Sequence, residues 1–313
     1  MSESYARPHR WVIGAGGLLG GAICRAAAER GEAPFTHRVT WDSRESALAS
    51  LTAGLQGFRR IRNGRRLEIL WCAGSGVTSS GQAHLEQEIS VLSEFLESLA
   101  NHLSPEELAS LTLFYPSSVG GVYGGSTDAP ITEVSATQAI SPYGEAKLRA
   151  ENIVRRFAHA HSVRVFIGRL SNLYGAGQDM RKGQGLISVL LQKNLERNAT
   201  TIFMPLDTLR DYIYVDDAAA LILDCVDRCA TASSSQTVTK IIAANSPTSI
   251  ASILGAVRTE LKRRPLVVMA STPQASMQAR NLTVQSVVWP DLDQRHLTSL
   301  PVGIMKMRRT LRS

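Results

Sequence analysis

The stretch Trp11-Val12-Ile13-Gly14-Ala15-Gly16-Gly17-Leu18-Leu19-Gly20 decides the fold of this chain. Three apolar residues run directly into a turn with glycines at positions 14, 17 and 20, and an amphipathic stretch to Arg30 follows. This order is typical of a strand that turns at once into a helix and brings its backbone close to the pyrophosphate of a dinucleotide. The amino end of such a helix also supplies partial positive charge. We therefore expect a dinucleotide cofactor to contact Gly14, Gly17, Leu18, Leu19 and Gly20.

Apolar runs of strand length alternate with amphipathic stretches of helix length as far as Ile167. This rhythm predicts parallel βαβ units, and hence an α/β fold with a doubly wound parallel sheet. The expected strands are residues 11–13, 38–41, 67–72, 111–115, 163–167 and 239–243, and the expected helices end near residues 30, 55, 100, 159 and 228. Beyond Ile167 the alternation loosens, with an amphipathic stretch at 186–195 and a polar segment at 231–236. We expect a cofactor domain that supplies most of the chain and a smaller lobe built from later segments.

The composition of the chain indicates a globular protein and argues against membrane-spanning, secreted and zinc-binding classes. The chain has 313 residues, of which 44% are hydrophobic, enough for a proper core. No apolar run approaches the roughly 20 residues that span a bilayer, and the first ten residues lack the hydrophobic stretch of a secretory signal, so we expect a cytoplasmic protein. The four cysteines lack the paired spacing with histidines that zinc requires, and we expect small buried side chains and no metal at Cys24, Cys72, Cys225 and Cys229.

The net charge is +7, and basic residues are concentrated at 59–66 and 306–312. Nucleic acid is the first partner that such charge suggests. No aromatic residues are interleaved with these arginines, however, and a solvated basic surface is the simpler interpretation. Attraction toward a doubly charged diphosphate ligand or an anionic membrane surface is a third. We expect no nucleic-acid partner and no membrane span.

The end of the second strand is where this architecture reads the adenosine ribose of the cofactor. A carboxylate there accepts hydrogen bonds from both ribose hydroxyls and disfavours a 2′-phosphate. Asp42 follows Val39-Thr40-Trp41 and favours NAD, whereas Arg44 lies two residues later and could neutralise the 2′-phosphate of NADP. Arg38 is a weaker candidate for the same role. We expect NAD as the cofactor, with NADP as the alternative.

Tyr143 and Lys147 are four residues apart and project from the same face of an expected helix. A lysine ammonium beside a phenol favours the phenolate, so the tyrosine can remove a hydroxyl proton as hydride leaves carbon. The lysine can also hold the nicotinamide ribose. A third group should donate to the substrate oxygen, and Ser118, with Ser117 as the alternative, follows the expected strand at 111–115. We expect these side chains to carry the chemistry.

Five motifs follow one another between about residues 10 and 225. They are the glycine turn at 14–20, Ser117-Ser118 with Val122-Tyr123-Gly124, Pro142-Tyr143-Gly144 with Lys147, the segment 169–178 and the segment 210–217. In this order they resemble the extended short-chain dehydrogenase/reductases of the NAD-dependent epimerase/dehydratase family, which act on nucleotide sugars. The resemblance implies a Rossmann-type domain for NAD(P), mainly residues 1–170 with about 210–245 returning to it, and a smaller substrate-binding lobe, mainly 171–313. It also implies a nucleotide-diphosphate sugar as substrate, a role in polysaccharide biosynthesis and a homodimer.

The resemblance further assigns two residues to the substrate. It places Asn172 near the cofactor and the substrate phosphates, and it places Arg210 against the diphosphate. A guanidinium presents a planar fork of donors that suits phosphate oxygens. The sequence leaves open an alternative, in which Arg210 forms a structural ion pair with Asp211 or Asp216.

Two departures from the family fall in the cofactor pocket. The family usually carries an asparagine where this chain has Glu86-Gln87-Glu88-Ile89-Ser90, and a His-x-Ala-Ala segment where it has Trp71-Cys72-Ala73-Gly74. We expect Ala73 and Gly74 to line a cofactor pocket that is altered locally. The end of the chain, from Trp289 to Arg312, also lacks the common ending of the family, so the resemblance does not identify the sugar.

Three reactions run on this scaffold: epimerisation at a sugar carbon, elimination of water, and reduction of a keto-sugar. Dehydratases of the family place an Asp-Glu pair directly after the catalytic hydroxyl, because elimination needs an extra acid and base. Val119 and Gly120 occupy those places here, which disfavours dehydration. We predict an epimerase, because Asp42 suits NAD, with a keto-sugar reductase as the alternative. A non-catalytic nucleotide-binding protein on the same fold is the hypothesis from a different class, and intact Tyr143 and Lys147 argue against it.

Overall fold

The computed structural model describes residues 8–61, 65–77, 80–178, 185–232, 237–272 and 278–310. Most of the polar segment expected at 231–236 lies outside these ranges, as do Arg62 and Arg312 of the two basic clusters. The strands are β1 (His9–Ile13), β2 (Leu67–Trp71), β3 (Thr112–Ser118), β4 (Arg164–Leu170), β5 (Asn172–Tyr174), β6 (Thr200–Ile202), β7 (Leu209–Tyr214), β8 (Thr237–Ile242), β9 (Pro247–Ser249) and β10 (Val267–Met269). The helices are α1 (Leu18–Glu29), α2 (Arg44–Arg60), α3 (Gln82–His102), α4 (Pro105–Ser110), α5 (Val119–Val122), α6 (Pro142–His161), α7 (Leu186–Leu195), α8 (Val215–Ala230), α9 (Ile250–Leu261), the 3₁₀ helix η2 (Pro290–Asp293) and α11 (Leu300–Thr310).

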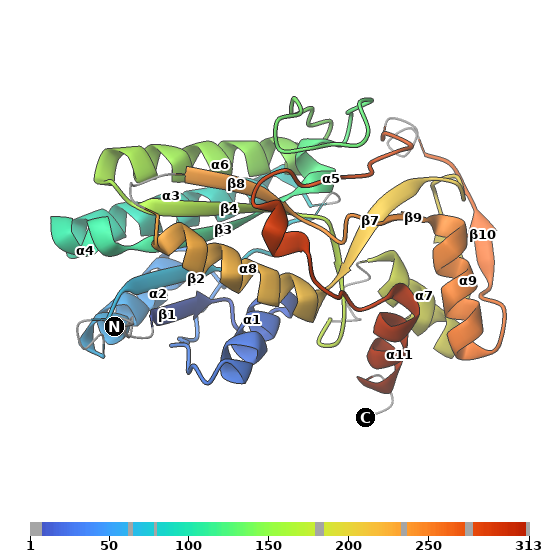
Figure 1. The fold of residues 1–313 in the computed structure, drawn as a ribbon, viewed down its shortest axis with the longest axis horizontal. Coiled ribbons are helices and arrows are strands. Elements are labelled where there is room, and N and C mark those ends of the chain that lie inside the picture. The colour runs from blue at the N-terminus through green and yellow to red at the C-terminus, as the bar shows by residue number, and fades with distance from the viewer. Residues whose placement is uncertain are drawn as a thin grey trace.

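Five parallel strands form the central sheet, in the order β1-β2-β3-β4-β8. Their side chains alternate between two hydrophobic clusters, one on each face. On one face Trp11, Ile69 and Leu113 pack with α2, α3 and α6. On the other face Val12 and Leu70 pack with α1 and α8. Figure 1 shows α3 and α6 on one side of the sheet and α8 and α1 on the other. The α/β fold class predicted from the sequence is therefore confirmed.

One predicted strand is wrong. Residues 38–41 form no strand, and the pairing at this edge of the sheet is a single parallel bridge between Phe35 and Trp11. It rests on two backbone hydrogen bonds, from Val12 N to the Phe35 carbonyl (3.0 Å) and from Phe35 N to the Arg10 carbonyl (2.7 Å). The chain therefore pairs with one edge of β1 at Phe35. It then crosses to the other edge of β1, where it forms β2. The direction of winding reverses at β1, and parallel sheets bind ligands at the carboxyl end of such a switch point.

The later segments build a second group of elements beside the sheet. Helices α7, α9 and α11 pack around a third hydrophobic cluster that includes Leu190, Ile253 and Ile304, and they lie together at one end of the molecule in Figure 1. Strand β7 pairs with β5 and β9 there, whereas α8 and β8 pack into the central sheet and its helices. Assignment of the smaller group to substrate binding remains a prediction. Within the part of the chain that the structure describes, no helix has the length and apolarity needed to cross a bilayer.

A buried ion pair fixes α6 against the sheet. The carboxylate of Glu151 accepts hydrogen bonds from Nε (2.9 Å) and Nη2 (2.7 Å) of Arg169 on β4, and both side chains are buried. The third guanidinium nitrogen, Nη1, donates to the Tyr123 hydroxyl. Burial alone would raise the pKa of Glu151, but the hydrogen bonds and charge of Arg169 outweigh it and lower the pKa below its ordinary value of 4.5. Removing either partner would leave a buried charge without compensation.

We expect Glu151→Gln to lower the free energy of unfolding by about 3–5 kcal/mol at pH 7, because Arg169 keeps its charge in a buried site. Since the folded pKa of Glu151 lies below the unfolded value, its contribution is complete above about pH 4.5 and is lost as pH falls through the folded pKa. The deficit of the variant should therefore shrink below pH 4.5. Urea unfolding at a series of pH values measures this. Glu86→Gln, which breaks an exposed pair between α3 and Arg149 of α6, is the matched control and should change stability far less. A deficit that stays constant with pH would contradict the argument.

Candidate active site

Two cavities meet at one side chain. A cleft of about 710 Å³ lies at the carboxyl ends of β1 and β2 and extends along α3 and α6. A second cavity of about 380 Å³ lies among α5, the start of α6 and the loop after β4. Tyr143 lines both of them and is the residue that their described linings share.

The glycine turn forms one end of the cleft. Gly14 has a φ of +85°, and its carbonyl accepts from Gly17 N at 3.0 Å. A Cβ at Gly14 would lie 2.8 Å from the backbone of Cys72 and Ala73, so only glycine lets β1 approach the loop after β2 this closely. A Cβ at Gly20 would overlap the Gly14 carbonyl, so α1 can pack this closely on the turn only with glycine at position 20.

The start of α1 suits a phosphate. Gly17 is the N-cap and no side chain of the described residues caps the helix, which leaves the first backbone N–H groups, including that of Leu18, available to an anion. A Cβ at Gly16 would meet nothing within 4 Å, so open space lies beside the turn. Among the described residues, Gly14 to Gly17 line the cleft, whereas Leu19 and Gly20 are buried in the packing of α1. The turn therefore fits the pyrophosphate of a dinucleotide. Leu19 and Gly20 do not line the described cleft but hold the turn in place through the packing of α1.

The structure places the two predicted ribose-reading residues outside the cleft lining. Asp42 is exposed and directly precedes Ser43, whose hydroxyl caps α2 by accepting from Ser46 N. Arg44 is the first residue of α2, and its Nε and Nη2 each donate at 2.7 Å to the Glu94 carboxylate on α3. Arg44 is thus bound to Glu94 at the start of α2, and Asp42 lies just before the N-cap. Arg38, the weaker candidate in the sequence, does line the cleft.

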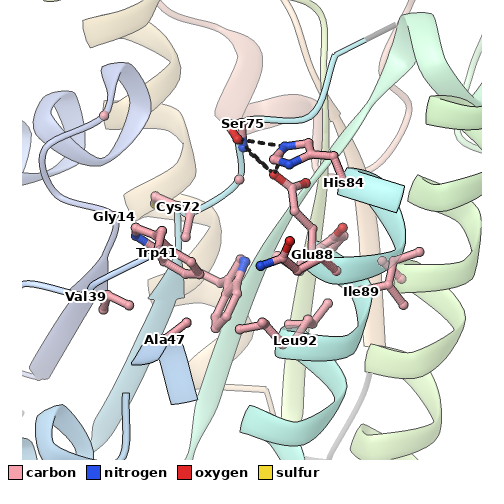
Figure 2. A pocket seen from close by; sticks show the side chains of 18 of the residues that line it. Gly14, Val39, Trp41, Ala47, Cys72, Ser75, His84, Glu88, Ile89 and Leu92 are labelled. Atoms are coloured by element: carbon pink, nitrogen blue, oxygen red, sulfur yellow. Dashed lines mark hydrogen bonds and ion pairs between the residues drawn. The ribbon is translucent and has the colours of Figure 1, made fainter. Parts of the chain in front are cut away.

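Aromatic and apolar side chains line a slot at the same end of the cleft. Trp41 lies edge-on to Trp71, with ring centroids 6.3 Å apart, and Val39 and Ala47 lie beside them (Figure 2). Leu92 of α3 closes the opposite side. Sequence reasoning did not assign these side chains to the cofactor, although it identified the segment 71–74 as altered. A slot of this kind fits an adenine ring.

The other wall carries polar groups from the loop after β2. Figure 2 shows Glu88 of α3 reaching Ser75, and its Oε1 accepts from the backbone N–H of Ser75 (2.5 Å) and of Gly76 (2.9 Å). His84 Nε2 lies 2.9 Å from the Ser75 hydroxyl. Ala73 and Gly74, both predicted from the sequence, line this part of the cleft. Glu88 stands in the segment where the sequence departs from the family, and its carboxylate holds the loop in place.

Tyr143 and Lys147 lie one turn apart on α6. The Lys147 ammonium donates to the Pro116 carbonyl at 3.1 Å and lies 5.7 Å from the centre of the Tyr143 ring and 5.3 Å from that of Tyr115. Burial opposes its charge, but Tyr115, Tyr143 and the Glu88 carboxylate together raise the pKa of Lys147 above that of an ordinary lysine. It is therefore a fixed cation beside two phenols. Tyr115 was not predicted from the sequence, and the same burial raises its pKa.

The structure separates the two serines. Ser118 lines the second cavity and caps α5, with its hydroxyl accepting from Gly121 N at 3.1 Å. Ser117 is buried on the other side of β3, where its hydroxyl faces Glu151. A Cβ at Gly121 would lie 3.1 Å from Tyr143 Cε1 and 3.3 Å from Ser118 Cβ, so the Tyr143 ring and the Ser118 side chain both lie against Gly121. Ser118, not Ser117, has the position from which to contact a substrate oxygen in the second cavity.

Arg210 brings an unpaired charge to the second cavity. Its Nη1 donates to the Leu209 carbonyl at 2.8 Å, whereas its Nη2 is buried and has no partner among the described residues. Burial lowers the pKa of Arg210 below that of an ordinary arginine. The alternative ion pairs do not form: the Asp211 carboxylate accepts from the backbone N–H of Ala244 and Ser246, and Asp216 pairs with Arg25. A buried donor without a partner costs free energy until an anion occupies the cavity.

Asn172 lies at the same cavity, on β5. Its amide Nδ2 donates to the Asp211 carbonyl at 2.8 Å, which orients the side-chain oxygen. The side chain is exposed, so a ligand can reach it. The two residues that the family resemblance assigned to the substrate therefore lie in one cavity with Ser118 and Tyr143.

Comparison with known proteins identifies the family. Residues 11–239 match the NAD dependent epimerase/dehydratase family. A putative UDP-glucose 4-epimerase of Methanocaldococcus jannaschii is 33% identical over 107 residues, which are 34% of this chain and 35% of the relative. A UDP-glucose 4-epimerase of Azospirillum brasilense is 27% identical over 241 residues, covering 69% of this chain and 68% of the relative. The first match thus spans about a third of that relative's length.

The fold is shared with solved structures. The UDP-glucose 4-epimerase of Thermus thermophilus, solved as a complex with NAD, superposes with a TM-score of 0.79. The match covers 97% of this chain and 99% of that one at 16% sequence identity. At that identity the likeness shows the arrangement of strands and helices.

We expect Gly17→Val to weaken dinucleotide binding by about tenfold or more, because the branched side chain occupies the space beside the first turn of α1. The fold should survive, since a Cβ at Gly17 meets only the Gly14 carbonyl oxygen, at 3.4 Å, and its φ of −85° suits valine. Calorimetric titration with NAD and with NADP measures the effect. Gly255→Val in α9, where a Cβ would meet nothing within 4 Å, is the control and should bind normally. Unchanged affinity in a folded Gly17→Val protein would show that the pyrophosphate is held elsewhere.

Proposed function

The chain belongs to the NAD-dependent epimerase/dehydratase family, and on that premise we propose that it transfers hydride at a ring carbon of a nucleotide-diphosphate sugar as an epimerase. The observation that carries the proposal is the position of Tyr143 between the cleft and the second cavity. One side of the phenol faces a site shaped for a dinucleotide, and the other faces Ser118 and Arg210. The epimerase relatives support the choice among reactions.

Each side chain has a role that follows from its position. Tyr143 removes the proton from a sugar hydroxyl, and Lys147, held as a cation, stabilises the phenolate that receives it. Ser118 donates a hydrogen bond to the same substrate oxygen. Arg210 and Asn172 hold the diphosphate and so fix the sugar against Tyr143. A bound nicotinamide dinucleotide would accept the hydride from the sugar carbon and return it.

A keto-sugar reductase is the second candidate, and one observation favours it. The sequence argument for an epimerase used Asp42 as the mark of NAD, but Asp42 does not line the described cleft. The two reactions differ in stoichiometry. An epimerase converts many sugars with no net change in the cofactor, whereas a reductase oxidises one reduced dinucleotide for each product. Turnover of UDP-, GDP- and dTDP-sugars followed together with absorbance of the reduced cofactor distinguishes them.

We expect Tyr143→Phe to lower the rate of hydride transfer by about 100-fold or more, in the range that general acid–base catalysis provides. Only the phenolic oxygen is lost, so dinucleotide affinity should stay close to that of the wild type. Single-turnover measurements report the chemical step, and titration with the dinucleotide reports binding. A variant that keeps more than a tenth of the rate would remove Tyr143 from the role of base.

Arg210→Ala should weaken binding of the preferred nucleotide sugar roughly 10- to 150-fold, the effect of losing a charge-assisted bidentate contact. Titration of a panel of UDP-, GDP- and dTDP-sugars measures it, with folding checked by thermal melting. Arg280→Ala is the matched control, because the Arg280 side chain is exposed and pairs with Asp207. Its carbonyl, which lies near Arg210, is kept. Equal affinity in wild type and Arg210→Ala would assign Arg210 a structural role.

A further inference from the structure

The position of the adenosine ribose follows from the two ends of the cleft. The glycine turn and the start of α1 fit the pyrophosphate, and the slot beside Trp41 and Val39 fits the adenine. The ribose joins these two groups covalently, so it must lie between them. The segment of chain that connects the two ends on this side is residues 36–39, and all four line the cleft.

The bridge at Phe35 brings the segment that carries Arg38 to the cleft. Phe35 pairs with Trp11 in parallel, and Arg38 follows three residues later. Arg38 and Gly14 both line the cleft. Arg38 therefore stands where a second strand of this architecture presents its ribose-reading residue, about 20 residues after the glycine turn.

The Arg38 guanidinium is free to bind a ligand. Among the described residues, none forms an ion pair or hydrogen bond with it, and the side chain is exposed. Thr36 and His37 are its neighbours on the wall, and the His37 ring stacks on Phe35, which holds this segment against β1. Arg44, the other arginine considered for this role, is bound to Glu94.

No carboxylate competes for the ribose at this position. In the described lining of the cleft, Glu88 is the one acidic side chain, and its Oε1 is bound to the backbone of Ser75 and Gly76. In Figure 2, Glu88 lies across the cleft from Val39, the neighbour of Arg38 in the sequence. A carboxylate at the ribose would accept from its hydroxyls and repel a 2′-phosphate. Here the wall presents a guanidinium, a hydroxyl and an imidazole instead.

We infer that this protein binds NADP(H) in preference to NAD(H), and that Arg38 is the residue that recognises the 2′-phosphate. The inference deepens the proposed function, because it takes the cleft as the dinucleotide site. A guanidinium can form two parallel hydrogen bonds to phosphate oxygens, which a 2′-hydroxyl cannot match. The sequence argument for an epimerase rested on NAD, so preference for the 2′-phosphate favours the keto-sugar reductase, and the cofactor stoichiometry of turnover decides between the two reactions.

Direct titration without any sugar tests the inference, using NADP and NAD, and adenosine 2′,5′-bisphosphate and adenosine 5′-phosphate as a pair that isolates the 2′-phosphate. Wild type should bind the 2′-phosphorylated member of each pair about tenfold more tightly or better. Arg38→Ala should lose roughly 10- to 150-fold in affinity for NADP while its affinity for NAD changes by less than about threefold. Arg44→Ala removes the same charge nearby and should change neither.

Three results would overturn the inference: wild type binding NAD as tightly as NADP, Arg38→Ala keeping its NADP affinity, or Arg44→Ala losing as much as Arg38→Ala. If Arg38→Ala does not fold, the wild-type comparison of the two adenosine phosphates still decides. The outcome is separable from that of the proposed function. A protein that binds NADP through Arg38 and converts no nucleotide sugar keeps the inference and loses the function, and one that epimerises sugars with equal affinity for both dinucleotides does the reverse.

Discussion

The close approach of α6 to α5 is the constraint on which the site depends. Gly144, on the first turn of α6, lies so near Gly121 that a Cβ would overlap the Gly121 carbonyl. The absence of side chains at these two positions lets the start of α6 dock at the carboxyl end of β3. Tyr143 is carried into the junction of the two cavities by this contact, and Lys147 and Glu151 follow at one-turn intervals along the same face. The lack of a side chain at Gly14 and Gly20 likewise lets α1 dock on the turn after β1.

Two guanidinium groups near this junction differ in whether they have an anionic partner. Behind it, the buried carboxylate of Glu151 and the guanidinium of Arg169 satisfy each other, and the pair anchors α6 to β4. In front of it, the Arg210 guanidinium has a buried nitrogen with no partner among the described residues. A protein interior tolerates an unpaired cation poorly, and this is why we propose that Arg210 binds an anionic ligand. The first arrangement holds α6 on the sheet, and the second is the basis of the proposed substrate contact.

The pairing at the edge of β1 determines which residues line this end of the cleft. The second strand is reduced to one bridge at Phe35, and the chain then runs along the cleft wall as far as Trp41 before α2 begins. As a result Asp42 precedes the N-cap of α2 and Arg44 begins the helix, whereas Arg38 lies on the cleft wall. The Trp41 and Trp71 rings line the same end of the cleft, where we propose that the adenine binds.

The sequence by itself determined the alternation of strands and helices, the glycine turn and the Tyr143–Lys147 pair, because period, glycine spacing and one-turn spacing are local properties. The family resemblance, not the local pattern, assigned Asn172 and Arg210 to the substrate, and the structure places both at one cavity. The sequence located the segments that contain Trp71 and Glu88 in the cofactor pocket but assigned these side chains no contact, and it did not identify Tyr115, because the reach of a side chain into the cleft depends on how the elements pack. The sequence did not decide between Ser117 and Ser118 as the catalytic hydroxyl, because neighbouring residues on a strand point to opposite faces of the sheet. It expected a strand at 38–41, because apolar residues there have strand character. Only the tertiary structure decided these points, because they depend on which edge of β1 the chain pairs with, where α2 begins and which side of β3 meets α6.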